Sequence, residues 1–243
     1  MTYSTDDVLR DHLAFRGGTA LNKLFFQPAT RYSEDIDLVQ TRPGPIGPIL
    51  DRIRERLAWL GVDPRRDRAP DMMHVHYAFE SEIEPIERLR LKIEINTREH
   101  DSVLPRIEVP FAVRSRWFDG EARIPTYALE ELLGTKLRAL YQRKKGRDLY
   151  DFAVAFERGS VDDAVVVQCF RSYMERGGHT VTRAQFEENL TTKMADVAFR
   201  EDIVPLLHVD ATYDADAAAR WVMERLISRL EGDPWKGRVP AGG

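Results

Sequence analysis

Hydrophobic and polar positions follow two different patterns along the chain. Up to Thr126, short apolar or alternating runs predict strands at His12–Arg16, Asp35–Gln40, His74–Glu80, Arg88–Arg98 and Val109–Phe118. Helical spacing between them predicts helices at Gly18–Phe26 and Ile46–Leu60. The proline-rich stretch around Pro45 and the polar stretch Asp63–Asp71 are expected to be loops.

Beyond Pro125 the strand signals stop and helical periodicity takes over. The predicted helices are Leu129–Lys144, Arg147–Glu157, Asp162–Arg176, Arg183–Asp196 and Asp214–Leu230. The sequence therefore predicts an α+β protein with two domains. Residues 1–125 would form a core with a mixed sheet, and residues 126–243 a helical domain.

The composition is that of an ordinary globular protein, with 43% hydrophobic and 31% charged residues. No run approaches the roughly 18 apolar residues of a membrane span, and the polar start lacks the apolar run of a secretory signal. A cytoplasmic protein without a membrane partner is expected. The single Cys169 cannot form an internal disulfide, which fits a reducing compartment.

A net charge of −4 argues against nucleic acid binding by the chain as a whole, because such binding depends on lysine and arginine. Basic islands nevertheless occur at Arg65–Arg68, Arg114–Arg116 and Arg143–Arg147. Each of them is compatible with a solvated face. The third island is the best candidate for an RNA contact, through Arg143, Lys144, Lys145 and Arg147.

Two carboxylates stand two residues apart on one predicted strand. The period of two places Asp35 and Asp37 on one face, and Ile36 and Leu38 on the other. Such a pair repels unless solvent or a cation neutralises it, and magnesium prefers hard oxygen ligands. The pattern predicts a metal site, with an exposed acidic edge strand as the alternative.

A glycine-rich turn precedes this strand. Gly17, Gly18 and Thr19 follow a strand end and begin a helix, where glycines allow close backbone approach and free amides favour an anion. A plain glycine turn capped by Thr19 is the alternative. The order of turn, short helix and acid pair favours a triphosphate cradle beside a metal site.

The strand predicted at Arg88–Arg98 also alternates, so that Lys92, Glu94 and Asn96 share its polar face. If this strand pairs beside the acid strand, Glu94 becomes a third carboxylate for the metal and Lys92 moderates the repulsion. The alternative is a polar face in water.

The helical half contributes a lysine at an unusual position. Lys136 lies inside a leucine stripe, three residues after Leu133 and four before Leu140. An inward lysine either extends to the domain edge or meets an anion, and we favour a contact with the nucleotide triphosphate across the cleft. Asp148 is either a helix cap or a site residue, and Asp151 one turn later is a possible salt-bridge partner.

Together these motifs resemble the AbiEii/AbiGii family, which comprises nucleotidyltransferase toxins of bacterial toxin–antitoxin systems and includes the MenT toxins. The resemblance extends from about Phe15 to Phe156. Its pieces, in chain order, are Phe15–Leu21, Arg31–Leu38, Leu91–Asn96, Thr135–Leu140 and Arg147–Asp151.

The resemblance implies a polymerase-beta-like nucleotidyltransferase domain followed by a helical C-terminal domain. It implies that Asp35 and Asp37 hold a catalytic Mg²⁺ or Mn²⁺, that Lys136 supports the nucleotide, and that Asp148 is the remaining essential acid. It also implies transfer of a nucleoside monophosphate, with CTP favoured as the donor NTP, to the 3′ acceptor end of tRNA, and a cognate antitoxin. The alternatives are a small-molecule or protein hydroxyl as acceptor, or a non-catalytic RNA- or partner-binding module.

Overall fold

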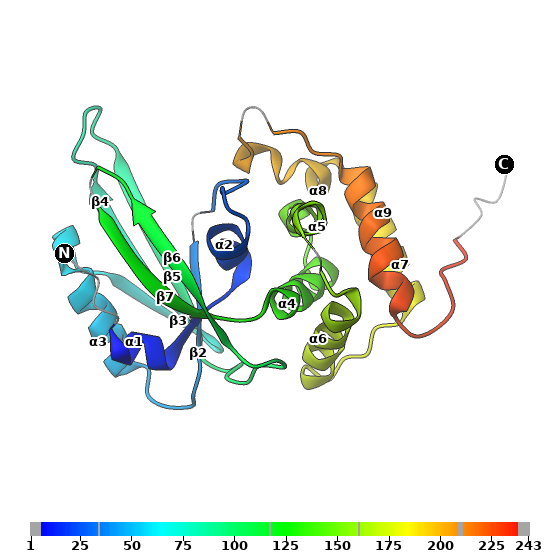
Figure 1. Cartoon of the computed structure of the whole chain (residues 1–243), viewed down its shortest axis with the longest axis horizontal. Helices are drawn as coiled ribbons and strands as arrows, with labels where there is room; N and C mark the ends of the chain where they lie inside the picture. The colour runs from blue at the N-terminus through cyan, green and yellow to red at the C-terminus, as the bar shows by residue number, and fades with distance from the viewer. Residues whose placement is uncertain (1–5, 34, 117, 160, 209–210, 238–243) are drawn as a thin grey trace. The chain divides into compact units, whose positions relative to one another are not determined.

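The computed structural model describes residues 6–33, 35–116, 118–159, 161–208 and 211–237. The chain divides into two units, shown in Figure 1. Unit 1 consists of Met1–Phe25 and Ser33–Ala128, and unit 2 of Phe26–Tyr32 and Leu129–Gly243. The chain therefore enters unit 2 for a short segment, returns to unit 1, and passes into unit 2 again after Ala128.

Unit 1 is built on a seven-stranded sheet with the order β3-β4-β5-β2-β1-β7-β6. Strand β2 runs parallel to β5 and antiparallel to β1, so the sheet is mixed, as the sequence predicts. The strands are β1 Leu13–Phe15, β2 Asp35–Gln40, β3 Arg65–Ala69, β4 Met72–Glu80, β5 Arg88–Asn96, β6 Ile107–Arg114 and β7 Asp119–Thr126.

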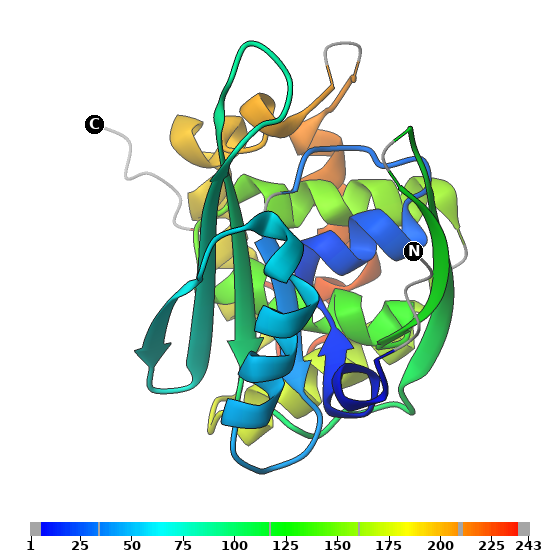
Figure 2. The same cartoon turned by 90° about the vertical axis from the view of Figure 1, so that its left-hand side faces the viewer.

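One face of this sheet carries the core of unit 1. Alternation along β4 and β5 buries residues such as Val75, Ile93 and Ile95, which cluster with Ile49 and Ile53 of helix α3. Figure 2 shows α3 (Gly47–Arg56) and α1 (Asp7–His12) on the same side of the sheet. The opposite face of β2 and β5 is left to polar residues.

Unit 2 is helical, and its core is rich in leucine and phenylalanine from α4, α6 and α7. Gly134 lets α4 pack closely on α6, because a Cβ at this position would collide with Cys169. Of the helices that the structure describes, none is long and apolar enough to cross a membrane. The helices are α4 Leu129–Gln142, α5 Gly146–Arg158, α6 Asp163–Arg176, α7 Arg183–Met194, α8 Val197–Glu201 and α9 Ala215–Arg225.

The α+β class and the helical second half are confirmed, but several local expectations are wrong. The polar stretch Asp63–Asp71 contains β3, because an exposed edge strand needs few apolar residues. The helix predicted at Gly18–Phe26 is a four-residue α2 (Gly17–Ala20) followed by a π-helical turn. Strand β6 ends at Arg114, and Trp117, inside the predicted strand, lies outside the described residues. Helices α1 and α8 and strand β7 were not predicted.

Candidate active site

Strand β2 presents Asp35 and Asp37 on the polar face of the sheet. Both carboxylates are partly exposed, while Ile36 and Leu38 pack against the core on the other face. The parallel pairing with β5 places Lys92 beside Asp35 and Glu94 beside Asp37. The strand arrangement that the sequence left open is therefore present, and it gathers three carboxylates and one lysine on one face.

The glycine turn is built directly against this acid strand. Gly17 has a φ of +74°, and a Cβ at this position would collide with the carboxylate of Asp37. The backbone N–H of Arg16 donates to the carbonyl of Asp37 at 2.9 Å. The Thr19 hydroxyl donates to the Asp35 carbonyl at 2.5 Å and also contacts the Ser33 hydroxyl. Thr19 thus fastens the turn to β2, with its side chain buried.

Glu94 is engaged by neighbouring basic groups. Its carboxylate forms an ion pair with Nζ of Lys92 and lies 3.9 Å from Nε2 of His74 on β4. The hydrogen bond to Glu94 raises the pKa of Lys92, and the charges of Asp35 and Asp37 raise it further. The lysine therefore balances part of the negative charge on this face.

The donor chemistry of the acid pair suits a divalent cation. Magnesium is commonly bound by one or two carboxylates together with water and substrate phosphates, rather than by a complete protein cage. Within the described ranges, no three His, Cys, Asp or Glu side chains gather as a metal site. Asp35 and Asp37 thus fit a cation whose other ligands arrive with the substrate, and a ligand role for Glu94 stays a prediction.

In unit 2, Lys136 is buried and lies between two carboxylates. Its side chain is 6% exposed, and Nζ lies 3.0 Å from Oδ1 of Asp148 and 2.9 Å from Oδ2 of Asp151. This geometry excludes an extended lysine that reaches solvent. It also corrects the capping interpretation of Asp148, because α5 begins at Gly146 after Lys145, and the Asp148 carboxylate accepts from Lys136 and Arg143.

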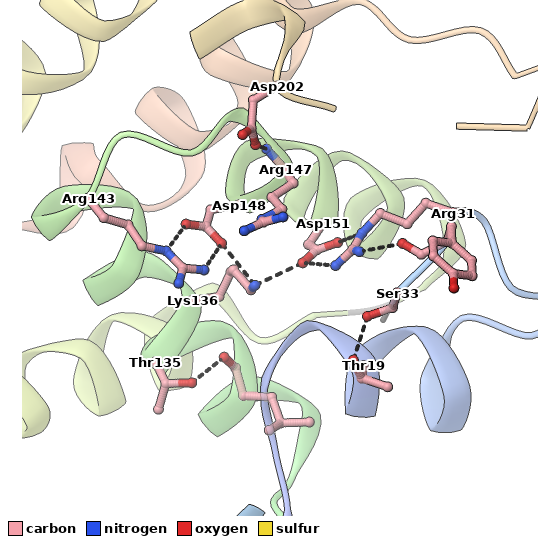
Figure 3. A network of polar contacts seen from close by, with 12 residues as sticks. Thr19, Arg31, Ser33, Thr135, Lys136, Arg143, Arg147, Asp148, Asp151 and Asp202 are labelled. Atoms are coloured by element: carbon pink, nitrogen blue, oxygen red, sulfur yellow. Dashed lines mark hydrogen bonds and ion pairs between the residues drawn. The ribbon is translucent and has the colours of Figure 1, made fainter. Parts of the chain in front are cut away.

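Two arginines complete this network, which we call the Lys136 network (Figure 3). Arg143 donates twice to the carboxylate of Asp148, each time at 2.7 Å. Arg31 donates twice to the carboxylate of Asp151, at 2.8 and 3.1 Å. The order Arg31, Asp151, Lys136, Asp148, Arg143 alternates in charge, and only Arg143 is substantially exposed, at 51%.

The network shifts the ionisation of its members. Burial alone would raise the pKa of Asp148, but Lys136 and Arg143 outweigh it and lower this pKa to about 2. Burial alone would lower the pKa of Lys136, but Asp148 and Asp151 raise it above its usual value. The pKa of Arg31 is likewise raised by Asp151 against the effect of burial. Asp148, Lys136 and Arg31 are therefore charged at neutral pH.

Comparison with known proteins places the chain in a family. The family model described as nucleotidyl transferase AbiEii toxin, of type IV toxin–antitoxin systems, matches residues 3–224. The chain belongs to the AbiEii family. No curated protein matches it in sequence.

The fold of this AbiEii protein matches that of a solved nucleotidyltransferase toxin. The nucleotidyltransferase toxin MenT4 of Mycobacterium tuberculosis H37Rv superposes with a TM-score of 0.62 at 19% identity, covering 90% of this chain and 76% of MenT4. An antigenic nucleotidyltransferase-like protein of Paracoccidioides brasiliensis matches with a TM-score of 0.42 at 15% identity, covering 75% of this chain and 84% of that protein. The expected family and the α+β fold class are thereby confirmed.

The basic island of this AbiEii protein is compensated by acids. Besides Arg143, which binds Asp148, Lys144 forms an ion pair with Asp196, and Nζ of Lys145 lies 3.5 Å from Asp202. The backbone N–H of Arg147 donates to the same Asp202 at 3.2 Å. An RNA contact by Arg143, Lys144, Lys145 and Arg147 stays a prediction.

Sequence reasoning missed Arg31. It lies in the motif Arg31–Leu38 that carries the family resemblance, but no role follows from the sequence, because its partner Asp151 lies 120 positions away. The only local signal is an arginine between a proline-containing turn and the acid strand.

Proposed function

We propose that this AbiEii-family protein is an enzyme of the EC 2.7.7 type that transfers a nucleoside monophosphate from an NTP to the 3′ end of tRNA. CTP is the favoured donor. The observation that carries the proposal is the glycine turn seated on the acid strand, with Gly17 in contact with Asp37. The glycine turn proposed to bind phosphate and the carboxylate pair proposed to bind the metal are thus neighbours within one unit.

The reaction is an in-line displacement. The ribose 3′ oxygen of the acceptor forms a bond to the α-phosphorus and gives up its proton to solvent, while the bond from that phosphorus to the pyrophosphate oxygen breaks and pyrophosphate leaves. Asp35 and Asp37 hold a divalent cation, Mg²⁺ or Mn²⁺, which when bound neutralises phosphate charge and lowers the pKa of the attacking hydroxyl. Gly17 and Gly18 admit the β- and γ-phosphates to the backbone, and Thr19 keeps this nucleotide-binding turn attached to β2.

The Lys136 network has a supporting role in the proposal. Lys136 supports the nucleotide as a cation, and Asp148 is the essential acid that orients it. The contact between Asp148 and Lys136 at 3.0 Å supports an orienting role. The network joins three cations to two carboxylates, which hold the amine of Lys136 in one place.

Membership of a toxin–antitoxin family supports an antitoxin partner, and the tRNA acceptor is the finer part of the proposal. A nucleotidyl transferase toxin blocks an essential process by modifying its target, and capping the 3′ end of tRNA prevents aminoacylation and translation. A toxin–antitoxin system supplies a cognate antitoxin that neutralises this activity. Nucleotidylation of a small molecule or of a protein hydroxyl, and a non-catalytic binding module, are the competing possibilities.

The test is a transfer assay with each α-labelled NTP and total tRNA. Periodate-oxidised tRNA is the matched control, because it lacks the 3′ hydroxyl acceptor while keeping the same charge and fold. We expect label in intact tRNA, strongest with CTP, and none in oxidised tRNA. Label that migrates with the protein or with a small molecule would favour the competing acceptors. If no acceptor became labelled with any NTP, the proposal of an enzyme would be wrong.

A further inference from the structure

The segment Phe26–Tyr32 is held by unit 2, although unit 1 flanks it on both sides in the sequence. Arg158 donates to the Pro28 carbonyl at 3.0 Å, and the Tyr150 hydroxyl donates to the Thr30 carbonyl at 3.2 Å. Its backbone also donates from Tyr32 to the Leu206 carbonyl at 2.8 Å. The chain reaches this segment directly after the helical turn that follows Gly17–Thr19.

Arg31 is the charged anchor of the segment. Its side chain is 4% exposed, and the Asp151 side chain that receives both of its hydrogen bonds is 2% exposed. A third hydrogen bond runs from the guanidinium to the Tyr32 carbonyl at 3.0 Å. Two parallel N–H···O contacts fix the orientation of both groups, which a lysine cannot do.

The anchor lies between two parts of the proposed reaction. The Asp151 carboxylate that binds Arg31 also forms an ion pair with Lys136. The position of this carboxylate therefore helps to fix the position of the lysine amine. On its own chain, Arg31 stands two residues before Ser33, which contacts Thr19, and four residues before Asp35. Arg31 is thus linked to Lys136 through Asp151, and it closely precedes the acid strand in the sequence.

We infer that Arg31 is a positioning residue of the nucleotidyl transfer, through Asp151 toward Lys136 and through the chain toward Ser33 and Asp35. The inference rests on the proposed function. Its burial and its two hydrogen bonds to the Asp151 carboxylate give the inference its geometric basis.

The variants separate charge from geometry. Arg31→Lys keeps the charge but loses the paired hydrogen bonds to Asp151. Arg158→Lys, on α5, changes an arginine that donates to the Pro28 carbonyl of the same segment, and it serves as the matched control. We expect Arg31→Lys to unfold cooperatively, to lower kcat by about ten- to a hundredfold, and to raise the half-saturating Mg²⁺ concentration, because small misplacements at a reacting site cost that much. Arg158→Lys should leave these constants near wild type.

A double variant tests the pairing itself. Arg31→Ala leaves Asp151 buried with one cation fewer, so it should lower the melting temperature more than Arg31→Ala combined with Asp151→Asn. Additive effects would show that the two side chains are not coupled and would overturn the inference. So would an Arg31→Lys enzyme with the kcat and Mg²⁺ dependence of the wild type.

A binding measurement distinguishes this inference from the proposed function. Mn²⁺ titration followed by electron paramagnetic resonance, in the presence of a non-hydrolysable CTP analogue, needs no turnover. We expect weaker Mn²⁺ binding in Arg31→Lys than in Arg158→Lys. If the wild type transfers no nucleotide, the proposed function fails, and this titration still decides Arg31: equal binding by both variants would overturn the positioning role.

Discussion

The two charged clusters of this AbiEii protein are built in opposite ways. On the sheet of unit 1, the acids Asp35, Asp37 and Glu94 share a partly exposed face with Lys92, whose amine is bound to Glu94. In the Lys136 network of unit 2, three cations alternate with two carboxylates, and four of the five side chains are buried. The first cluster is made mostly of carboxylates on a partly exposed face, and the second of buried ion pairs.

The difference indicates different roles. A partly exposed carboxylate pair can accept a cation from solution, because its oxygens remain reachable and their mutual repulsion favours binding. A buried network that supplies its own counterions is already satisfied, and it fixes the geometry of each member. We therefore expect changes in the first cluster to affect chemistry, and changes in the second to affect stability as well.

The largest effect is expected from Asp37→Ala. Loss of a metal ligand should reduce transfer at least about a thousandfold, since several kcal/mol of transition-state stabilisation depend on the cation. The free energy of unfolding should not fall, because one repelling charge is removed. Turnover with saturating CTP and urea denaturation would measure both quantities.

Asp67→Ala is the matched control for this change. Asp67 is a carboxylate on β3, 44% exposed and ion-paired with Arg65, and should matter little for activity or stability. If Asp37→Ala were as active as the wild type in magnesium, the acid cluster of unit 1 would not serve the chemistry, and the contrast between the two clusters would be wrong.

The second effect concerns the turn. Gly17 and Gly61 both have positive φ, 74° and 69°, but only at Gly17 would a Cβ meet another side chain, that of Asp37. Gly61→Ala should cost about 1 kcal/mol of stability through backbone strain alone. Gly17→Ala should cost more, and it should lower kcat about a hundredfold because it displaces Asp37, the proposed metal ligand.

Thermal unfolding and single-turnover kinetics of the two glycine variants would test this prediction side by side. If both variants lost the same stability and kept full activity, the contact between the turn and Asp37 would have no catalytic importance. If both lost activity, a general loss of folding would be the explanation.

The sequence predicts the first cluster better than the second, for a physical reason. Alternation along a strand is a local property, so the shared face of Asp35 and Asp37 follows from neighbouring residues. The position of Lys136 in a leucine stripe likewise indicates an inward side chain. Which acids form ion pairs with Lys136 depends on how the helices pack, and the pairing of Arg31 with Asp151 depends on the same packing. Periodicity carries no information on such partners.

Strand β3 is an element that the sequence pattern fails to predict. Its residues Arg65–Ala69 are mostly charged because the strand lies at the edge of the sheet, and their pairing with β4 is a tertiary event. The short α2 shows another limit. The spacing indicates one long helix, but the structure has a single α-helical turn followed by a π-helical turn, and Thr19 of α2 binds the first residue of β2.

The third prediction uses acid to break the Lys136 network. The pKa of Asp148 is lowered from 3.8 to about 2, so its carboxylate stabilises the fold above pH 4, and this contribution is lost as the pH falls toward 2. The shift corresponds to about 2 kcal/mol. Urea denaturation between pH 7 and pH 2 should show this acid limb in the wild type.

The variant Asp148→Asn should lose that part of the acid limb and be less stable at pH 7, because Lys136 and Arg143 lose their carboxylate. Asp71→Asn is a suitable control, since Asp71 is 55% exposed in an ion pair with Arg98 and should contribute little. An acid limb unchanged in Asp148→Asn would show that this carboxylate is not responsible.

The smallest effect is expected at the basic island that follows Arg143 in the sequence. Lys144 and Lys145 are 53% and 47% exposed and pair with Asp196 and Asp202, which reduces their value as an RNA contact. Arg143 must be left intact in this test, because it holds Asp148 and its removal would disturb the Lys136 network.

Replacing Lys144 and Lys145 together by glutamine should weaken tRNA binding modestly if the island contacts phosphates. The dependence of log K on log salt should become shallower by roughly 1.5, since two fewer counterions are released. Nucleotide affinity should not change, because neither lysine belongs to the Lys136 network. Filter binding at several salt concentrations gives the slope, and replacing Arg114 and Arg116 by glutamine gives the matched comparison. A slope that changes only in the second variant would assign the tRNA to Arg114–Arg116, and the acidic partners of Lys144 and Lys145 would then mark an ordinary solvated surface.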